Sequence, residues 1–283
     1  MNFAMKKIAA VCAVGAMGAF GASAANAAAV ASAYLNVTDF KLNVISGSVG
    51  ALNFTNNIDA SAKLNGVVDA HPTVGSGPGS FMSERATVGP DSGSYTPGVA
   101  YTTNPGDLYF AGSYAERDGD ARTAAGARAL TDATVVLDTN GDGSSQTNTG
   151  VTGFATVFVA DTVTFNLSFL YDYFIRVDLD QPKTSVLASL SWSLEVRQGA
   201  TKVIDIDAID MVVGVDSTID EYEDSANDVA YVSTNYTLGA GTYQFALRQI
   251  AQADATLIPE PGSLALAGLG LLGLGALRRR KSA

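Results

Sequence analysis

The sequence offers few side chains that could act as a catalytic base or a metal ligand. His71 is the only histidine and Cys12 the only cysteine among the 283 residues. A Ser-His-Asp site would depend on His71, but no G-x-S-x-G nucleophile elbow accompanies it. One histidine and one cysteine do not supply the ligands that zinc usually takes. Because His71 precedes Pro72 in a Gly-rich stretch, we expect it in an exposed loop, and we predict no catalytic residue.

The stretch DTNGDGSSQTNT, residues 138–149, contains the sharpest local signal. Three alternating side chains with oxygen atoms precede a glycine, as in the first half of a calcium loop, and the candidate ligands are Asp138, Asn140 and Asp142. The twelfth position is Thr149, so the bidentate carboxylate of such a loop is missing. Asn-Gly and Asp-Gly pairs between strand-like flanks suit a hairpin turn equally well. A calcium site and a hairpin turn both stay open, and the turn is favoured.

Carboxylates also cluster in the run DSTIDEYEDSAND, residues 216–228. Together with three aspartates upstream, they could bind a cation or present the carboxylate pair of a glycosidase. The residues concerned are Asp205, Asp207, Asp210, Asp216, Asp220, Glu221, Glu223, Asp224 and Asp228. A glycosidase holds two carboxylates at a set separation across a cleft, which spacing along the chain does not reveal. A solvated acidic face is the favoured interpretation.

The charge of the chain restricts its partners. The formal net charge is −11, and the two ends carry six of the 17 Lys and Arg residues but only one of the 28 carboxylates. Residues 28–258 therefore hold 11 cations and 27 carboxylates, a net charge of −16. Binding to nucleic acid or to anionic lipid needs clustered cations, so we expect neither as a partner of this part.

The first 27 residues have the pattern of a secretory signal peptide. Lys6 and Lys7 are followed by an apolar segment to about residue 20 and then by small residues. Ala25 and Ala27 frame an A-x-A cleavage site. Cys12 lies in the removed segment, so the exported domain, residues 28–258, would contain no disulfide.

The other end of the chain has the pattern of a membrane anchor. Residues 262–277 are apolar and would extend about 24 Å as a helix, which snorkelling cations can match to a membrane. The basic stop consists of Arg278, Arg279, Arg280 and Lys281. Because positive charge stays in the cytoplasm, we predict a single transmembrane helix with the preceding domain outside.

This end resembles the PEP-CTERM sorting signal in the order of its parts. Pro259, Glu260 and Pro261 precede the apolar span, and the Arg cluster ends it. The resemblance implies that residues 259–283 hold the protein transiently in the inner membrane until an exosortase cuts it. It also implies an association with exopolysaccharide in Gram-negative bacteria. An ordinary tail anchor is the alternative.

A second resemblance lies in the acidic run. Glu223, Asp224, Ser225 and Ala226 resemble the motif of the EDSAP group of PEP-CTERM proteins, although Asn227 stands where that motif has proline. No biochemical activity follows from this resemblance.

Alternation of apolar and polar residues indicates an all-β fold between the two ends. In LSWSLEV, Leu190, Trp192, Leu194 and Val196 would point inward. We predict one antiparallel β-sandwich, jelly-roll-like, with a long irregular loop over 71–106. The Ala-rich stretch 115–133 is the one segment compatible with a helix.

The leading functional hypothesis is an exported, non-enzymatic protein of the cell surface or extracellular matrix. A carbohydrate-binding module or a glycan-active enzyme on the same sandwich is the alternative. A sugar-binding surface would use exposed tyrosines of the loop-rich region, for which Tyr95, Tyr101 and Tyr114 are the candidates.

Overall fold

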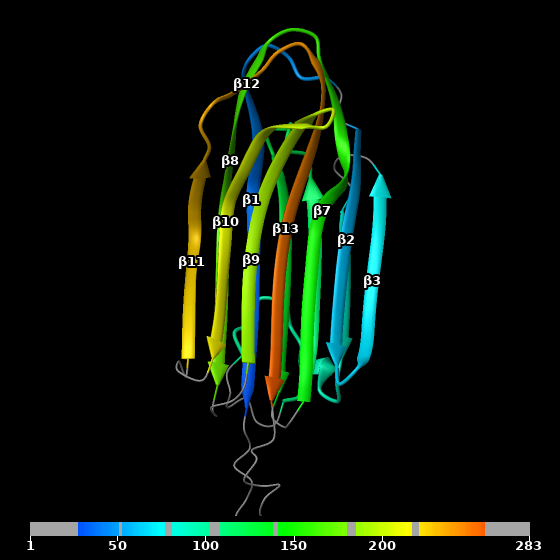
Figure 1. Cartoon of the computed structure of the whole chain (residues 1–283), viewed down its shortest axis with the longest axis vertical. Helices are drawn as coiled ribbons and strands as arrows, with labels where there is room; N and C mark the ends of the chain where they lie inside the picture. The colour runs from blue at the N-terminus through cyan, green and yellow to red at the C-terminus, as the bar shows by residue number, and fades with distance from the viewer. Residues whose placement is uncertain are drawn as a thin grey trace, which may run out of the picture.

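The computed structural model describes residues 28–50, 53–76, 81–101, 108–137, 141–179, 185–216 and 221–257. These residues form two stacked antiparallel sheets (Figure 1). Sheet A has seven strands in the order β11-β8-β1-β6-β5-β4, with β12 also paired to β8. Sheet B has six strands in the order β10-β9-β13-β7-β2-β3. The predicted antiparallel β-sandwich is confirmed, whereas its jelly-roll form stays a prediction.

The strands are long, and several run the length of the molecule (Figure 1). Sheet A contains β1 (Ala29–Ser46), β4 (Met82–Val88), β5 (Phe110–Gly119), β6 (Ala127–Leu137), β8 (Val163–Leu179), β11 (Glu221–Val232) and β12 (Tyr236–Leu238). Sheet B contains β2 (Asn53–Leu64), β3 (Val67–Ser76), β7 (Gly141–Val159), β9 (Ser185–Gln198), β10 (Thr201–Asp216) and β13 (Gly241–Leu257). One 3-10 turn, η1 (Ser92–Ser94), lies between β4 and β5.

Apolar and polar residues alternate in the sequence because one face of each strand packs in the core between the sheets. Leu190, Trp192, Leu194 and Val196 of β9 are all buried, as predicted, and Trp192 is only 1% exposed. The Trp192 ring lies 4.6 Å from that of Phe169 in β8 and 5.6 Å from that of Phe40 in β1. These rings join the two sheets in the middle of the core.

A buried amide also bridges the sheets. Gln249 of β13 is 1% exposed, and its side-chain nitrogen lies 2.9 Å from the Leu35 carbonyl oxygen and 3.2 Å from that of Ala129. The same nitrogen lies 3.2 Å from the Thr131 hydroxyl oxygen. Gln249 thus links β13 of sheet B to β1 and β6 of sheet A.

The stretch 115–133, whose composition is compatible with a helix, forms no helix in the structure. Its residues form the end of β5, a turn and the start of β6. Gly119 and Gly126 take positive φ values of 82° and 73°, which interrupt any helix. The alanines at 115 and 133 are fully buried between the sheets, so tertiary packing overrides their helix propensity.

The predicted loop at 71–106 is wrong in part. Residues 71–76 complete β3, and β4 and η1 follow within the same stretch. The β2–β3 hairpin turns at Asn65 and Gly66, whose φ values of 49° and 82° suit a two-residue Asn-Gly turn. His71 therefore lies on an edge strand and not in a loop.

Both ends of the described domain lie at the same end of the sandwich (Figure 1). Ala29 at the start of β1 pairs with Leu137 of β6. Leu257 at the end of β13 pairs with Gly141 of β7, and β7 follows β6 in the chain. The predicted signal peptide (1–27) and sorting segment (259–283) lie outside the described residues.

We expect Gln249→Ala to lower the free energy of unfolding by about 1–3 kcal/mol, because buried acceptors lose their donor. Chemical denaturation of the purified protein measures this change. Gln252→Ala is the matched control, since Gln252 lies on the same strand with its amide nitrogen on Asp254, 2.6 Å away, and it is only partly buried. Equal effects of the two substitutions would contradict a bridging role for Gln249.

Candidate functional site

The four residues that resemble the EDSAP motif lie in β11, at the edge of sheet A. Glu223 pairs in register with Arg176 of β8, and Asp224 pairs with the buried Ile175. Because side chains alternate along a strand, Asp224 points toward sheet B while Glu223 points away from it. The Tyr173 hydroxyl donates to Asp224 over 3.1 Å. The motif thus attaches an edge strand to β8 by one contact on each face.

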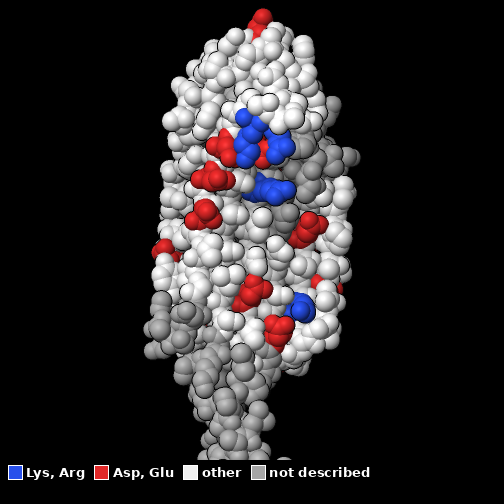
Figure 2. Space-filling model, viewed as in Figure 1, with Lys and Arg blue, Asp and Glu red and all other residues white. Residues whose placement is uncertain are grey.

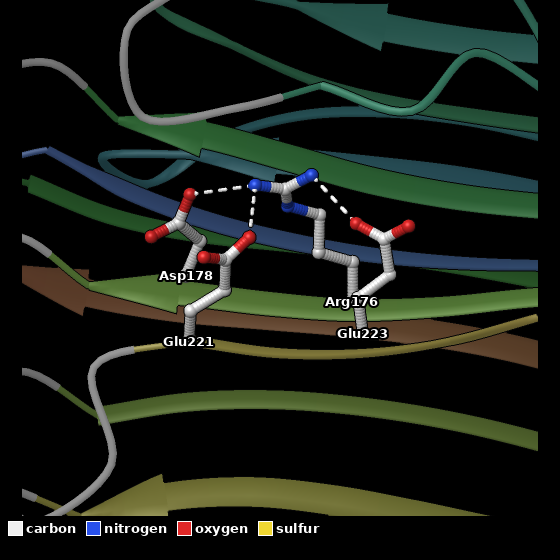
Figure 3. A network of polar contacts seen from close by, with 4 residues as sticks. All are labelled: Arg176, Asp178, Glu221 and Glu223. Carbon is white, nitrogen blue, oxygen red and sulfur yellow. Dashed lines mark hydrogen bonds and ion pairs between the residues drawn. The ribbon is translucent and has the colours of Figure 1, made fainter.

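Arg176 is the centre of the outer contact (Figure 3). Its side chain is only 10% exposed, and its guanidinium lies 2.8 Å from the Glu223 carboxylate and 2.7 Å from that of Glu221. Asp178 contributes a third carboxylate at 3.0 Å. A buried guanidinium is stable only when its charge is paired, so this network holds β11 on β8.

The acidic residues of the sequence run do not gather at one point. Glu221 and Glu223 lie on β11 of sheet A, whereas Asp205, Asp207 and Asp210 lie exposed on β10 of sheet B. Within the described ranges, no group of three or more His, Cys, Asp or Glu residues could hold a metal ion. Asp228 instead has a structural place, because its backbone N–H donates to Asp172 over 2.7 Å. Asp220 lies outside the described residues, and the side chain of Asp216 is not described.

Most of the stretch with the calcium-like pattern, residues 141–149, lies within β7. Strand β6 belongs to sheet A and β7 to sheet B, so the favoured hairpin turn is wrong. Asp142 is exposed at the start of β7, with its carboxylate 3.6 Å from the Lys63 ammonium and 3.2 Å from the Thr256 hydroxyl. Asp138 and Asn140 lie outside the described residues, and calcium binding stays a prediction.

His71 takes part in the closure of one side of the sandwich. Its Nε2 lies 2.9 Å from a carboxylate oxygen of Asp69, and the imidazole is half exposed. The second carboxylate oxygen of Asp69 accepts the backbone N–H of Thr87 in β4 over 2.8 Å. The Thr73 hydroxyl bonds to Glu84, which also joins β3 to β4. His71 therefore belongs to an edge contact between the two sheets.

Two of the three tyrosines expected to bind sugar are buried, so that prediction is wrong for them. Tyr95 is 2% and Tyr101 7% exposed, and both pack with Phe110 in a small core on the outer face of sheet A. Tyr114 is half-buried, and its hydroxyl donates to Glu116 over 2.7 Å. The segment after β4 covers these rings, which the loop-like composition of the sequence did not reveal.

Asp132 of β6 is the acceptor at the centre of this small core. It accepts the Tyr95 hydroxyl and the Gly98 N–H, each over 2.7 Å. Burial raises the pKa of Asp132 to about 6, against the lowering effect of the Gly98 and Tyr95 hydrogen bonds. Neither Asp132 nor Arg176 was singled out from the sequence. The available signal was a charge inside an apolar strand pattern, in LTDATVVL and in FIRVDL.

Cations on the face of sheet B are neutralised by their neighbours. Figure 2 shows Lys and Arg side chains gathered near one end of this face, next to acidic ones. Lys202 lies 2.9 Å from Asp205 and 3.6 Å from Glu195, and Arg197 also contacts Glu195. This group does not form the unpaired basic patch that binding to nucleic acid requires.

Comparison with family models identifies a PEP-CTERM protein-sorting motif at residues 257–281. The match contains Pro259, Glu260 and Pro261 and all four cations from Arg278 to Lys281, so the predicted sorting signal is confirmed. The motif implies an exported protein that an exosortase processes. Comparison with curated proteins and with solved structures gives no significant match.

The described part of the chain contains no helix of the length and apolarity that membrane crossing requires. The predicted transmembrane helix at 262–277 and the cleavage site at Ala25 and Ala27 lie outside that part. Both remain predictions, as does membership of the EDSAP group.

We expect Arg176→Ala to loosen β11, because three carboxylates lose their common cation. The free energy of unfolding should fall by roughly 1–3 kcal/mol, and limited proteolysis should cut within Glu221–Val232 sooner. Lys202→Ala removes two exposed ion pairs and serves as the control, with little expected change. Unchanged proteolysis of β11 in Arg176→Ala would contradict the clamp.

We expect Asp132 to make the fold less stable as the pH rises from about 4 to above 6. Its pKa is about 6 in the folded state and near 3.8 when unfolded, so the folded state binds the proton more tightly. The stabilisation is complete below the unfolded pKa and disappears as the pH passes the folded pKa, a change of roughly 3 kcal/mol. In denaturation curves measured between about pH 4 and pH 7, Asp132→Asn should abolish this pH-dependent loss of the free energy of unfolding. Asp205→Asn should retain the loss.

Proposed function

We propose that this protein is a non-enzymatic component of the cell surface or extracellular matrix, associated with exopolysaccharide or biofilm. The observation that carries the proposal is the sorting motif at residues 257–281, which follows directly on the last strand of the sandwich. A protein with this motif is exported and then processed by an exosortase at the membrane, which would bring the folded domain to the polysaccharide outside the cell. Its final location would be the cell surface or the medium.

The route to that location follows from the arrangement of the chain ends. The signal peptide would be cleaved after Ala27, and the helix at 262–277 would hold the protein in the inner membrane. Leu257 is the last residue of β13, so Pro259 follows within about 7 Å of extended chain. Both ends of the domain lie at one end of the sandwich, which would face the membrane (Figure 1). The exosortase would then act close to the folded domain.

The roles of the buried charged groups support a structural function. Arg176 holds an edge strand, and Asp132 holds the segment that covers the outer face of sheet A. His71 contacts Asp69 on the same edge strand β3, and Asp69 accepts the Thr87 N–H of the edge strand β4. Of the residues that a catalytic interpretation of the sequence would use, His71, Glu221 and Glu223 are engaged in these structural contacts.

A carbohydrate-binding module is the second candidate. Partly exposed tyrosines on the inner face of β8 and β11 favour this candidate over a glycan-active enzyme. Calcium held by Asp138, Asn140 and Asp142 remains part of the proposal, and the melting temperature in millimolar calcium tests it.

We expect Glu260→Ala to leave the protein in the inner membrane, because the substitution removes the charge between the two prolines of the sorting motif. Intact mass of the protein from medium and from membranes measures the outcome in a cell that contains an exosortase. The wild-type product should lack residues 262–283, and the control Asp207→Ala should be processed normally. Release of Glu260→Ala at the wild-type rate, or a released wild-type chain that retains the segment, would contradict exosortase sorting.

A further inference from the structure

The two lateral sides of the sandwich differ in how they are closed. On one side, the edge strands β3 and β4 are joined by the Thr73–Glu84 and Asp69–Thr87 contacts. On the other side, the edge strands are β10 and β11. Among the residues that the structure describes, no hydrogen bond, ion pair or ring contact links β10 to β11. The inner face of β11 is partly exposed on this side, whereas Ile175 and Val177 of the neighbouring β8 are fully buried.

Tyrosines occupy the inner face at this open side. Tyr171 and Tyr173 follow the buried Phe169 on the same face of β8, and Tyr231 of β11 pairs with Phe169 in register. The Phe169 and Tyr231 rings stack with centroids 4.8 Å apart, and those of Tyr171 and Tyr173 stack at 6.1 Å. Tyr222 pairs with Val177 further along β11 and is 38% exposed. A row of rings thus leads from the core to the surface.

Polar atoms accompany these rings. The Tyr173 hydroxyl donates to Asp224, whose carboxylate has further acceptor capacity. Partial burial, together with Asp224, raises the pKa of Tyr173, and burial raises that of Tyr231, so both phenols stay neutral hydrogen-bond donors. Aromatic faces beside donors and a carboxylate match the surface of a pyranose. A pyranose has C–H bonds on its faces and hydroxyl groups around its rim.

Charge at the open side restricts the ligand further. Asp224 lies among the tyrosines on the inner face, whereas Glu221 and Glu223 of β11 and Asp205, Asp207 and Asp210 of β10 lie on the outer faces of the two sheets at this side. Figure 2 shows acidic side chains along the side of sheet B where β10 lies. The guanidinium of Arg176 is already shared by three carboxylates. A uronate, a phosphorylated glycan or an anionic lipid would be repelled there.

We propose that Tyr171, Tyr173, Tyr222 and Tyr231, together with Asp224, form a binding surface for an uncharged polysaccharide chain. We name this surface the tyrosine edge. The inference rests on the proposed association with exopolysaccharide. It specifies where on the domain the polysaccharide binds and that the polysaccharide is uncharged. The tyrosine edge lies on the opposite lateral side from the contacts of His71.

The test uses the full-length chain in a detergent without a sugar headgroup, with isotope-labelled tyrosine rings observed by NMR. The probes are three neutral hexasaccharides, namely cellohexaose, maltohexaose and mannohexaose, with hexagalacturonate as the anionic comparison. We expect the Tyr173 and Tyr222 signals to shift with at least one neutral probe and not with the uronate. Tyr222→Ala and Tyr173→Ala should each weaken binding about two- to tenfold, since each removes one ring contact.

Matched variants separate a binding role from a structural one. Tyr114→Ala, at a half-buried tyrosine on the outer face of sheet A, should leave the affinity unchanged. Tyr173→Phe retains the ring and removes only the hydroxyl, so it stays informative if Tyr173→Ala unfolds. Melting curves identify unfolded variants, and Tyr222→Ala at an exposed site provides an independent test.

Three outcomes would overturn the inference. The first is the absence of any shift with all three neutral probes at millimolar concentration. The second is binding that Tyr114→Ala reduces and Tyr222→Ala does not. The third is a shift of the tyrosine-edge signals with protein concentration alone, which would make this side an interface between copies of the chain. Processing of the same variants, measured by mass, reports separately on sorting, so either proposal can fail without the other.

Discussion

The contact of Trp192 with Phe169 and Phe40 is the interaction on which the arrangement of the two sheets depends. Trp192 comes from sheet B and the two phenylalanines come from neighbouring strands of sheet A. Asp39, with a φ of 53°, forms the bulge next to Phe40 and shifts the register of β1. With Phe169 fixed at this contact, the following inner residues of β8 are the tyrosines of the open side. The clamp at Arg176 then positions β11 beside them.

The strand pattern could be predicted from sequence because burial on one face leaves a period of two. It succeeded for β9, where Trp192 alternates with serines. It left the Ala-rich stretch at 115–133 undecided, because alanine suits a helix and a tightly packed sandwich interior equally well. The Asn-Gly pairs were also ambiguous in the sequence, because such a pair can either form a hairpin turn or stand between strands of different sheets. Asn65-Gly66 forms a hairpin turn, whereas the strands on either side of residues 138–140, β6 and β7, belong to different sheets.

The candidate site could be predicted only at the chain end, where the signal is contiguous. The motif Pro259-Glu260-Pro261 and the Arg cluster are read in order along the chain, and no fold is needed to bring them together. The acidic residues near positions 205–228 required the fold, which separates them onto two sheets. The tyrosines also required it, because composition placed Tyr95 and Tyr101 on the surface although a covering segment buries them.

The central claim is that a two-sheet core stands outside the membrane as one folded domain, with its partners bound at its edges. Trp192 is the only tryptophan, so its fluorescence reports on that core alone. We predict that emission from the native protein is blue-shifted and protected from acrylamide. It should move to the red in a single transition on denaturation. Native emission that is already red and freely quenched would show that the sheets do not pack around Trp192, and would contradict the account.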